Sequence, residues 1–248
     1  MRTKSSFLTL LPGVLFLFFW EWSVHDSDRL KFLFAAPSLI AQTGFSELQQ
    51  ADIWKDCGIT LLEALLGLFF GTLLGTASGL LLWASRSIDT IARPYVILIG
   101  SIPVFALAPV MIVWFGIGLL SKAVMAGFAV YFVSLVQAYE GAHAIAAQYL
   151  NYAHSIRAPR FRLIFKIIVP GSIHWVLTGF RMNVGFALTG AFIGEFVSSE
   201  AGIGHYILKA SSLYDMPKVF LGLLLISIMA MALTGLADII RRSYNPEK

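Results

Sequence analysis

Six runs of mostly apolar residues, each about as long as a bilayer is thick, dominate this sequence of 248 residues. A spanning helix needs roughly 20 such residues, because nothing in the lipid core can satisfy bare backbone groups. One water-soluble core cannot bury this much apolar surface. We therefore expect an all-α integral membrane protein with six transmembrane helices. The runs cover residues 7–24, 59–85, 93–116, 121–139, 173–197 and 219–240.

The composition agrees with this class and excludes others. Hydrophobic residues make up 58% of the chain and charged residues 13%, whereas soluble domains average about 25% charged residues. Disordered chains need the opposite balance, with low hydrophobicity and high charge. The single cysteine, Cys57, excludes a disulfide framework and a zinc site built from cysteines.

The first run, residues 7–24, has two interpretations. A basic start before an apolar run is typical of a cleaved signal peptide and also of an uncleaved anchor. The run is long for a signal, and Trp20, Glu21 and Trp22 stand where small residues would precede cleavage. We favour an anchor whose tryptophans lie in the interfacial aromatic belt.

The lysines and arginines predict the orientation. With a cytoplasmic N-terminus, the cytoplasmic loops and ends hold eleven of them and the external segments six, in line with the positive-inside rule. Both termini are then cytoplasmic, and the net charge of +4 reflects topology rather than nucleic-acid binding. We divide the chain into a first helix with an external segment (1–58), a transmembrane domain (59–242) and a cytoplasmic tail (243–248).

Glycines recur at every fourth position of the second run. Residues four apart share a helix face, and small residues there let a second helix approach closely in lipid. We expect a tight helix contact, with static packing favoured over a moving contact. The glycines are Gly67, Gly71, Gly75 and Gly79.

Prolines interrupt the third run, and a few charges lie inside others. Pro103 and Pro109 each remove an interior backbone hydrogen bond, so we expect kinks that are either structural or part of a pathway. Arg181 either snorkels to the surface, pairs with Asp238 or meets an anionic solute. Glu195 is a further pathway candidate.

Other expectations concern the ends of the runs. Pro94 suits the first turn of a helix, and the Ala36-Pro37-Ser38 sequence marks a helix start. We expect a short interfacial helix over residues 40–54. Glu63 lies near one end of the second run, and we expect it to be interfacial.

The sequence lacks the common catalytic motifs. There is no phosphate-binding loop with Gly-x-x-x-x-Gly-Lys-[Ser/Thr] spacing and no His-Glu-x-x-His motif, and the five histidines are scattered. We expect no catalytic, cofactor or metal site. A secondary transporter would show inverted repeats and buried charge pairs, and a membrane enzyme would show clustered acids or histidines. Neither pattern is recognisable.

The polar segment of residues 140–170 separates the fourth and fifth runs. We expect an amphipathic helix over 148–156 and a turn at Ala158-Pro159. Such a helix can dock into a groove on a soluble partner. In the alternative interpretation, Arg160, Arg162 and Lys166 anchor the segment at the membrane surface.

This segment resembles the coupling motif in permease subunits of bacterial ABC importers. That motif reads Glu-Ala-Ala, three residues, Gly, nine residues and Ile-x-Leu-Pro. Pro170 fits its last position, and the segment 151–153 fits Glu-Ala-Ala. The departures are Asn151, Tyr152 and, at the Gly position, Arg157.

Two further blocks are similar to the taurine, alkanesulfonate, nitrate and bicarbonate permease group. One is Trp-Phe-Gly-Ile-Gly at 114–118, preceded by the Ser-Ile-Pro sequence at 101–103. The other is Gly-Glu-Phe at 194–196, followed by Gly-Ile-Gly at 202–204. The resemblance extends over about residues 35–242.

The resemblance implies a type I importer fold in the bacterial inner membrane. The permease would form a homodimer with two ATPase subunits, which bind the ATP, and a periplasmic or lipid-anchored solute-binding protein would deliver the solute. Gly202 and Gly204 would contact that protein. The cargo would be a small organosulfonate, nitrate or similar anion, or alternatively a thiamine pyrimidine precursor or an aromatic acid. The implied ATPase-coupling residues are Asn151, Tyr152, Ala153, Arg157, Ala158, Pro159, Arg160, Phe161 and Pro170.

Overall fold

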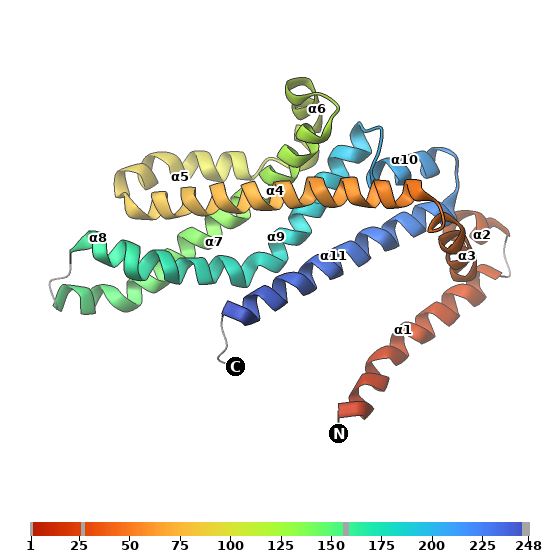
Figure 1. The fold of residues 1–248 in the computed structure, drawn as a ribbon, viewed down its shortest axis with the longest axis horizontal. Helices are drawn as coiled ribbons and strands as arrows, with labels where there is room; N and C mark the ends of the chain where they lie inside the picture. The colour runs from red at the N-terminus through yellow and green to blue at the C-terminus, as the bar shows by residue number, and fades with distance from the viewer. Residues whose placement is uncertain (1, 26–27, 156–158, 245–248) are drawn as a thin grey trace.

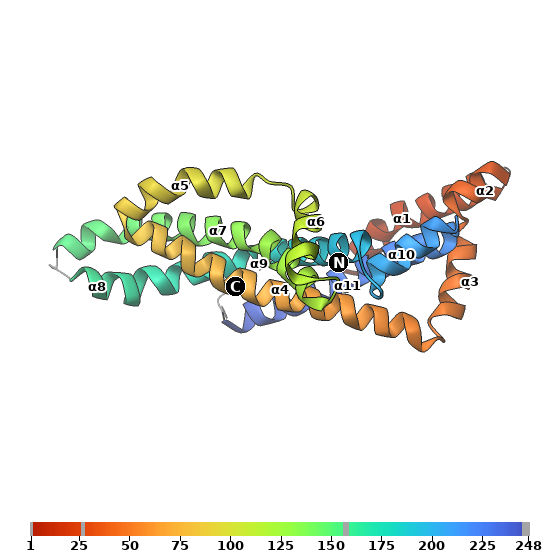
Figure 2. The ribbon, with the colours of Figure 1, turned by 90° about the horizontal axis from the view of Figure 1, so that it is seen from above.

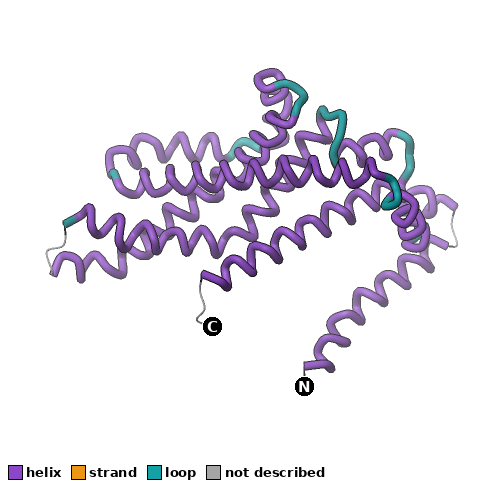
Figure 3. Tube along the Cα trace, viewed as in Figure 1, coloured by secondary structure: helices purple, strands orange, loops and turns teal. Residues whose placement is uncertain are grey.

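A computed structural model describes residues 2–25, 28–155 and 159–244. These residues are helical apart from short turns, and no strand occurs among them (Figures 1 and 3). The helices are α1 (Arg2–His25), α2 (Asp28–Phe34), α3 (Pro37–Glu47), α4 (Ala51–Ala84), α5 (Arg86–Gly100), α6 (Val104–Phe115), α7 (Leu119–Ser155), α8 (Arg160–Leu163), α9 (Val169–Val197), α10 (Ile203–Ser212) and α11 (Met216–Tyr244), with a π-helical turn at Ile164–Ile168.

Four helices in the described part of the chain are long and apolar enough to cross a membrane. They are α4, the first 29 residues of α7, α9 with its π-helical turn, and α11. The bent pair α5 and α6 makes a fifth if the two form one span. Helix α1 covers the first apolar run. An integral membrane fold is therefore confirmed, while six spans and cytoplasmic termini remain predictions.

The third run bends at Pro103, as expected, but the bend separates two helices instead of kinking a single one. Helix α5 begins at Arg86, so Pro94 lies in its interior rather than in a first turn. The chain then bends by 95° between α5 and α6. The bend falls before Pro103, which lacks an N–H group and disfavours a helical conformation in the preceding residue. Pro109 lies inside α6 without a break.

The segment 140–170 is also more regular than expected. Helix α7 continues without interruption to Ser155, so residues 148–155 extend the fourth span instead of forming a separate helix. The turn before Pro159 lies outside the described residues. The chain returns through α8 and the π-helical turn, which precedes Pro170. A widened turn fits here, because proline cannot bond the carbonyl four residues before it.

The predicted external segment after α1 contains two short helices. Helix α3 begins at Pro37, as the Ala36-Pro37-Ser38 sequence predicts. It ends at Glu47, and Trp54 already belongs to α4, so a single helix over 40–54 is wrong. Gln50 has an extended backbone and separates α3 from α4.

The core lies where α4, α7 and α9 pack together (Figures 1 and 2). Small and aliphatic side chains fill it, such as Ala64 from α4, Ala126 and Val130 from α7, and Ala187 and Ala191 from α9. Helix α11 packs along α9, while the N-terminal end of α1 extends away from the bundle (Figure 1). Helix α1 meets the bundle through α2, through α3 and through the ring contact of Trp20 with Phe220 of α11. The α8 end and the α10 end lie at opposite extremes of the molecule.

Candidate functional site

The glycine stripe of α4 faces α7. A Cβ atom at Gly67 would collide with the backbone of Gly127, and one at Gly75 would collide with the carbonyl of Tyr131. Gly71 and Gly79 are equally close to α7. The two helices therefore approach each other at backbone distance over about three turns, and α4 and α7 form one packed unit.

The first turn of α10 is held by side chains from other helices. The N–H group of Gly202 donates to Asp56 Oδ1 at 2.8 Å, that of Ile203 to Thr60 Oγ1 at 2.9 Å, and that of Gly204 to Glu195 Oε2 at 2.7 Å. The first N–H groups of a helix have no partner within it. Acceptors from α4 and α9 supply those partners here and fix α10 onto the core.

Both glycines of the Gly-Ile-Gly motif are needed for this contact. Gly202 has a φ of +103°, a conformation that side chains rarely adopt, and a Cβ there would collide with the Glu195 carboxyl group. A Cβ on Gly204 would lie 2.7 Å from the Cβ of Glu195. The motif thus lets a helix start directly on top of a buried carboxylate.

Three ionisable side chains meet beneath this turn, and we call them the buried charge cluster. Glu63 of α4 is 2% exposed, Lys122 of α7 is 2% exposed and Glu195 of α9 is fully buried. Glu195 Oε1 accepts a hydrogen bond of 2.6 Å from the Thr60 hydroxyl. The Lys122 ammonium donates to the carbonyl of Ile117 and attracts both carboxyl groups.

Sequence reasoning missed most of this cluster. We expected Glu63 to be interfacial, but it is buried among helices. A buried group of ionisable side chains exists, although none was recognised from the sequence. A signal was present: Asp56, Thr60 and Glu63 are spaced by four and three residues, which puts three polar groups on one face of an apolar helix. Lys122 carried no such signal, because its partners come from other helices.

Other predicted residues lie elsewhere. Arg181 forms a 2.6 Å ion pair with Asp238 across α9 and α11, with 60% of the arginine side chain exposed. Asn151, Tyr152 and Ala153 belong to the last turns of α7, Arg160 and Phe161 to α8, and Pro170 to the start of α9. Arg157 and Ala158 lie outside the described residues. The predicted coupling residues that are described therefore lie at the α8 end, opposite the buried charge cluster.

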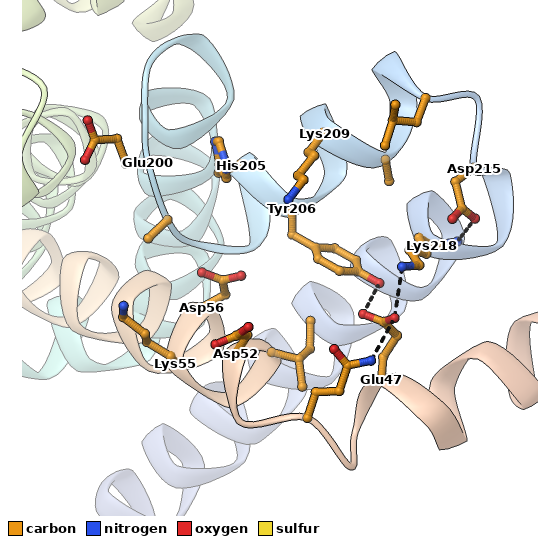
Figure 4. Close-up of a pocket in the computed structure, with 15 residues that line it drawn as sticks. Glu47, Asp52, Lys55, Asp56, Glu200, His205, Tyr206, Lys209, Asp215 and Lys218 are labelled. Carbon is orange, nitrogen blue, oxygen red and sulfur yellow. Dashed lines mark hydrogen bonds and ion pairs between the residues drawn. The ribbon is translucent and has the colours of Figure 1, made fainter.

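A polar cleft of about 350 Å³ opens beside α10, between it and the junction of α3 and α4 (Figure 4). Tyr206 donates a 3.3 Å hydrogen bond to Glu47, which also forms a 3.0 Å ion pair with Lys218. Burial and the Glu47 carboxylate raise the pKa of Tyr206, so this hydroxyl remains a donor. Both acidic and basic side chains line this cleft, among them Asp52, Lys55 and Lys209.

The sequence matches the family described as "Binding-protein-dependent transport system inner membrane component" over residues 67–247. A probable ABC transporter permease protein of Haemophilus influenzae is 32% identical over 90% of each chain. The taurine transport system permease protein of Escherichia coli is 27% identical, covering 95% of this chain and 88% of its own. The formylaminopyrimidine transport permease protein of Halalkalibacterium halodurans is 26% identical over 92% of each.

A solved structure of the methionine ABC transporter MetNI, in an inward-facing conformation, has the same fold. The superposition has a TM-score of 0.69 at 17% sequence identity and covers 77% of this chain and 95% of the other. This match identifies the fold as that of a type I ABC importer permease. The chain therefore belongs to the binding-protein-dependent transport system inner membrane components, as an ABC importer permease.

Proposed function

We propose that this permease forms the transmembrane pathway for a small solute, and that separate ATPase subunits drive it from the α8 end. The observation that carries the proposal is the length of α7. Its apolar run ends at Tyr139, before Glu140, but the helix continues to Ser155. Residues 148–155, which include the segment similar to the coupling motif, thus project beyond the span on a continuous helix.

In this proposal the ATPase groove receives the end of α7 and the start of α8. Closure of the ATPases on ATP moves these two helix ends, and α7 transmits the movement because it is unbroken to Ser155. A helix of 37 residues is about 55 Å long. The permease itself supplies no catalytic group and no cofactor, since ATP binds to the partner.

The break between α5 and α6 supports a second permease copy. Backbone without helical hydrogen bonds is tolerated at membrane depth only where protein or water covers it. Residues 101–103 are exposed, as are Ile97 and Val113 on either side, and α5 buries no residue. A second copy packed against α5 and α6 covers this break, and we propose a homodimer on this ground.

The solute belongs to the same proposal. We favour an organosulfonate, nitrate or similar anion, in line with relatives named for taurine and aliphatic sulfonates. Relatives named for formylaminopyrimidine and riboflavin support a thiamine pyrimidine precursor or another aromatic solute as the alternative. A periplasmic or lipid-anchored solute-binding protein makes the choice and docks on the predicted external side, at the α10 end, where Gly202 and Gly204 are themselves buried. We place the complex in the bacterial inner membrane.

Native mass spectrometry of the permease co-expressed with the ATPase encoded beside it tests this assembly. We expect two permeases and two ATPases in one complex. A permease that stays monomeric and free of ATPase would overturn the proposal. Binding of taurine, nitrate and formylaminopyrimidine to the solute-binding protein from the same gene cluster then decides the class of solute.

A further inference from the structure

Lys122 needs compensation for its burial. Lysine is almost never fully buried without a partner, because removing an ammonium group from water is costly. It donates to the Ile117 carbonyl in the connection before α7, and the carboxyl groups of Glu63 on α4 and Glu195 on α9 lie close enough to act on its charge. Gly194 makes room for it, since a Cβ there would lie 2.8 Å from Lys122 Cγ. The contact between α7 and α9 is thus shaped around this side chain.

Glu195 extends the same contact to α10. One carboxyl group accepts from Gly204 N and from the Thr60 hydroxyl, and Thr60 in turn accepts from Ile203 N. The start of α10 is therefore bonded to α4 and α9 through groups that also face Lys122. A displacement of Lys122 changes the charge environment of the carboxylate that holds α10.

The surroundings leave room for a rearrangement. A cavity of about 310 Å³ borders Glu63 and Lys122 and reaches Ser199, Glu200 and Ala201 in the turn before α10. Glu63 Oε2 has no hydrogen-bond partner although it is buried. A buried oxygen without a partner next to free volume allows the ammonium group to exchange partners.

Helix α7 connects this cluster with the opposite end of the molecule. Lys122 lies in its first turn, and residues 151–155 form its last. We propose that the buried charge cluster, Glu63, Lys122 and Glu195, is a latch through which α10 follows the movement of α7 during the transport cycle. The proposal rests on the proposed function, because that function supplies the movement at the α8 end.

Hydrogen exchange of the permease–ATPase complex in nanodiscs tests the latch, measured with and without ATP and vanadate. Two peptides are followed: residues 148–155, which report ATPase engagement, and residues 198–212, which report α10. In the wild type we expect the exchange of both peptides to change with nucleotide. In Lys122→Met we expect the first response to persist and the second to fall at least about fivefold.

Matched variants separate the latch from a general loss of charge. Glu195→Gln keeps the shape of the carboxyl group and should reproduce the Lys122→Met result. If Lys122→Met fails to assemble, Glu195→Gln serves as the test variant in its place. Lys218→Met breaks the ion pair with Glu47 at the same end and should leave both responses unchanged.

The outcomes distinguish the latch from the function on which it rests. The latch is overturned if hydrogen exchange of the wild-type 198–212 peptide does not change with nucleotide. It is also overturned if Lys122→Met and Glu195→Gln both show the same change in this peptide as the wild type. A 148–155 peptide that shows no protection when the ATPase binds overturns the proposed coupling segment instead.

Discussion

At the scale of single residues, the packing at the start of α10 restricts which residues can occupy positions 202 and 204. Gly202 and Gly204 are required because a side chain at either position would occupy the space of Glu195. The sequence indicated Glu195 as a pathway candidate, and the family resemblance indicated Gly202 and Gly204 together as a contact for the binding protein. Their common contact could not be predicted, because the spacing along a chain shows which residues share a helix face but not which face lies opposite.

Gly202→Ala should destabilise the protein by about 1–3 kcal/mol, because it strains a left-handed backbone and displaces a buried carboxylate. Thermal unfolding in detergent measures this effect. Gly118→Ala is the control, since a Cβ there meets no atom within 4 Å. Equal melting temperatures for the two variants would contradict the role of Gly202.

Arg181→Ala should cost about 1 kcal/mol of stability, because the arginine side chain is 60% exposed, although Asp238 is only 21% exposed. The comparison with Asp238→Asn decides its role in transport. A loss of solute uptake in Arg181→Ala but not in Asp238→Asn indicates that the arginine meets the solute. Equal, small losses indicate an ion pair that only stabilises α9 against α11.

At the scale of helices, regular periodicity was the most informative signal. The glycine stripe predicted a close helix contact, and the partner proved to be α7. Helix ends were harder to predict: α5 begins before Pro94, and α7 continues to Ser155 through polar residues that resemble a loop. Polarity shows where a helix leaves the lipid and not where it ends, because a solvated helix satisfies its own backbone.

Gly71→Leu combined with Gly75→Leu should impair folding or assembly, because each added side chain would collide with the α7 backbone. Overpacking of this kind costs about 1–3 kcal/mol per site. The yield of monodisperse permease after membrane extraction measures the effect. Gly58→Leu on the same helix is the matched control, with open space around it. Normal yield and transport in the double variant would refute the packing role.

Charge reversal at the α8 end should release the ATPase. We expect Ala153→Glu with Arg160→Glu and Arg162→Glu to reduce co-purification of the ATPase at least about tenfold, a loss of roughly 1.4 kcal/mol or more in binding. Arg86→Glu, at the start of α5, is the control for a general change in charge. Unchanged co-purification would remove the assignment of the coupling segment.

At the scale of the whole molecule, two polar regions lie at opposite ends of an apolar bundle. The α8 end holds the segment similar to the coupling motif, and the α10 end holds the buried charge cluster and the polar cleft (Figures 1 and 4). Buried charges are also typical of secondary transporters. The family match identifies this chain as part of a binding-protein-dependent importer instead. The energy source of transport can be tested directly.

Solute uptake into proteoliposomes is the most direct test of this account. The vesicles contain the permease and its ATPase, with the solute-binding protein and labelled solute outside and ATP inside. We predict uptake that requires ATP and the binding protein and persists when ionophores collapse all ion gradients. Uptake by the permease alone, driven by an ion gradient without ATP, would contradict the account.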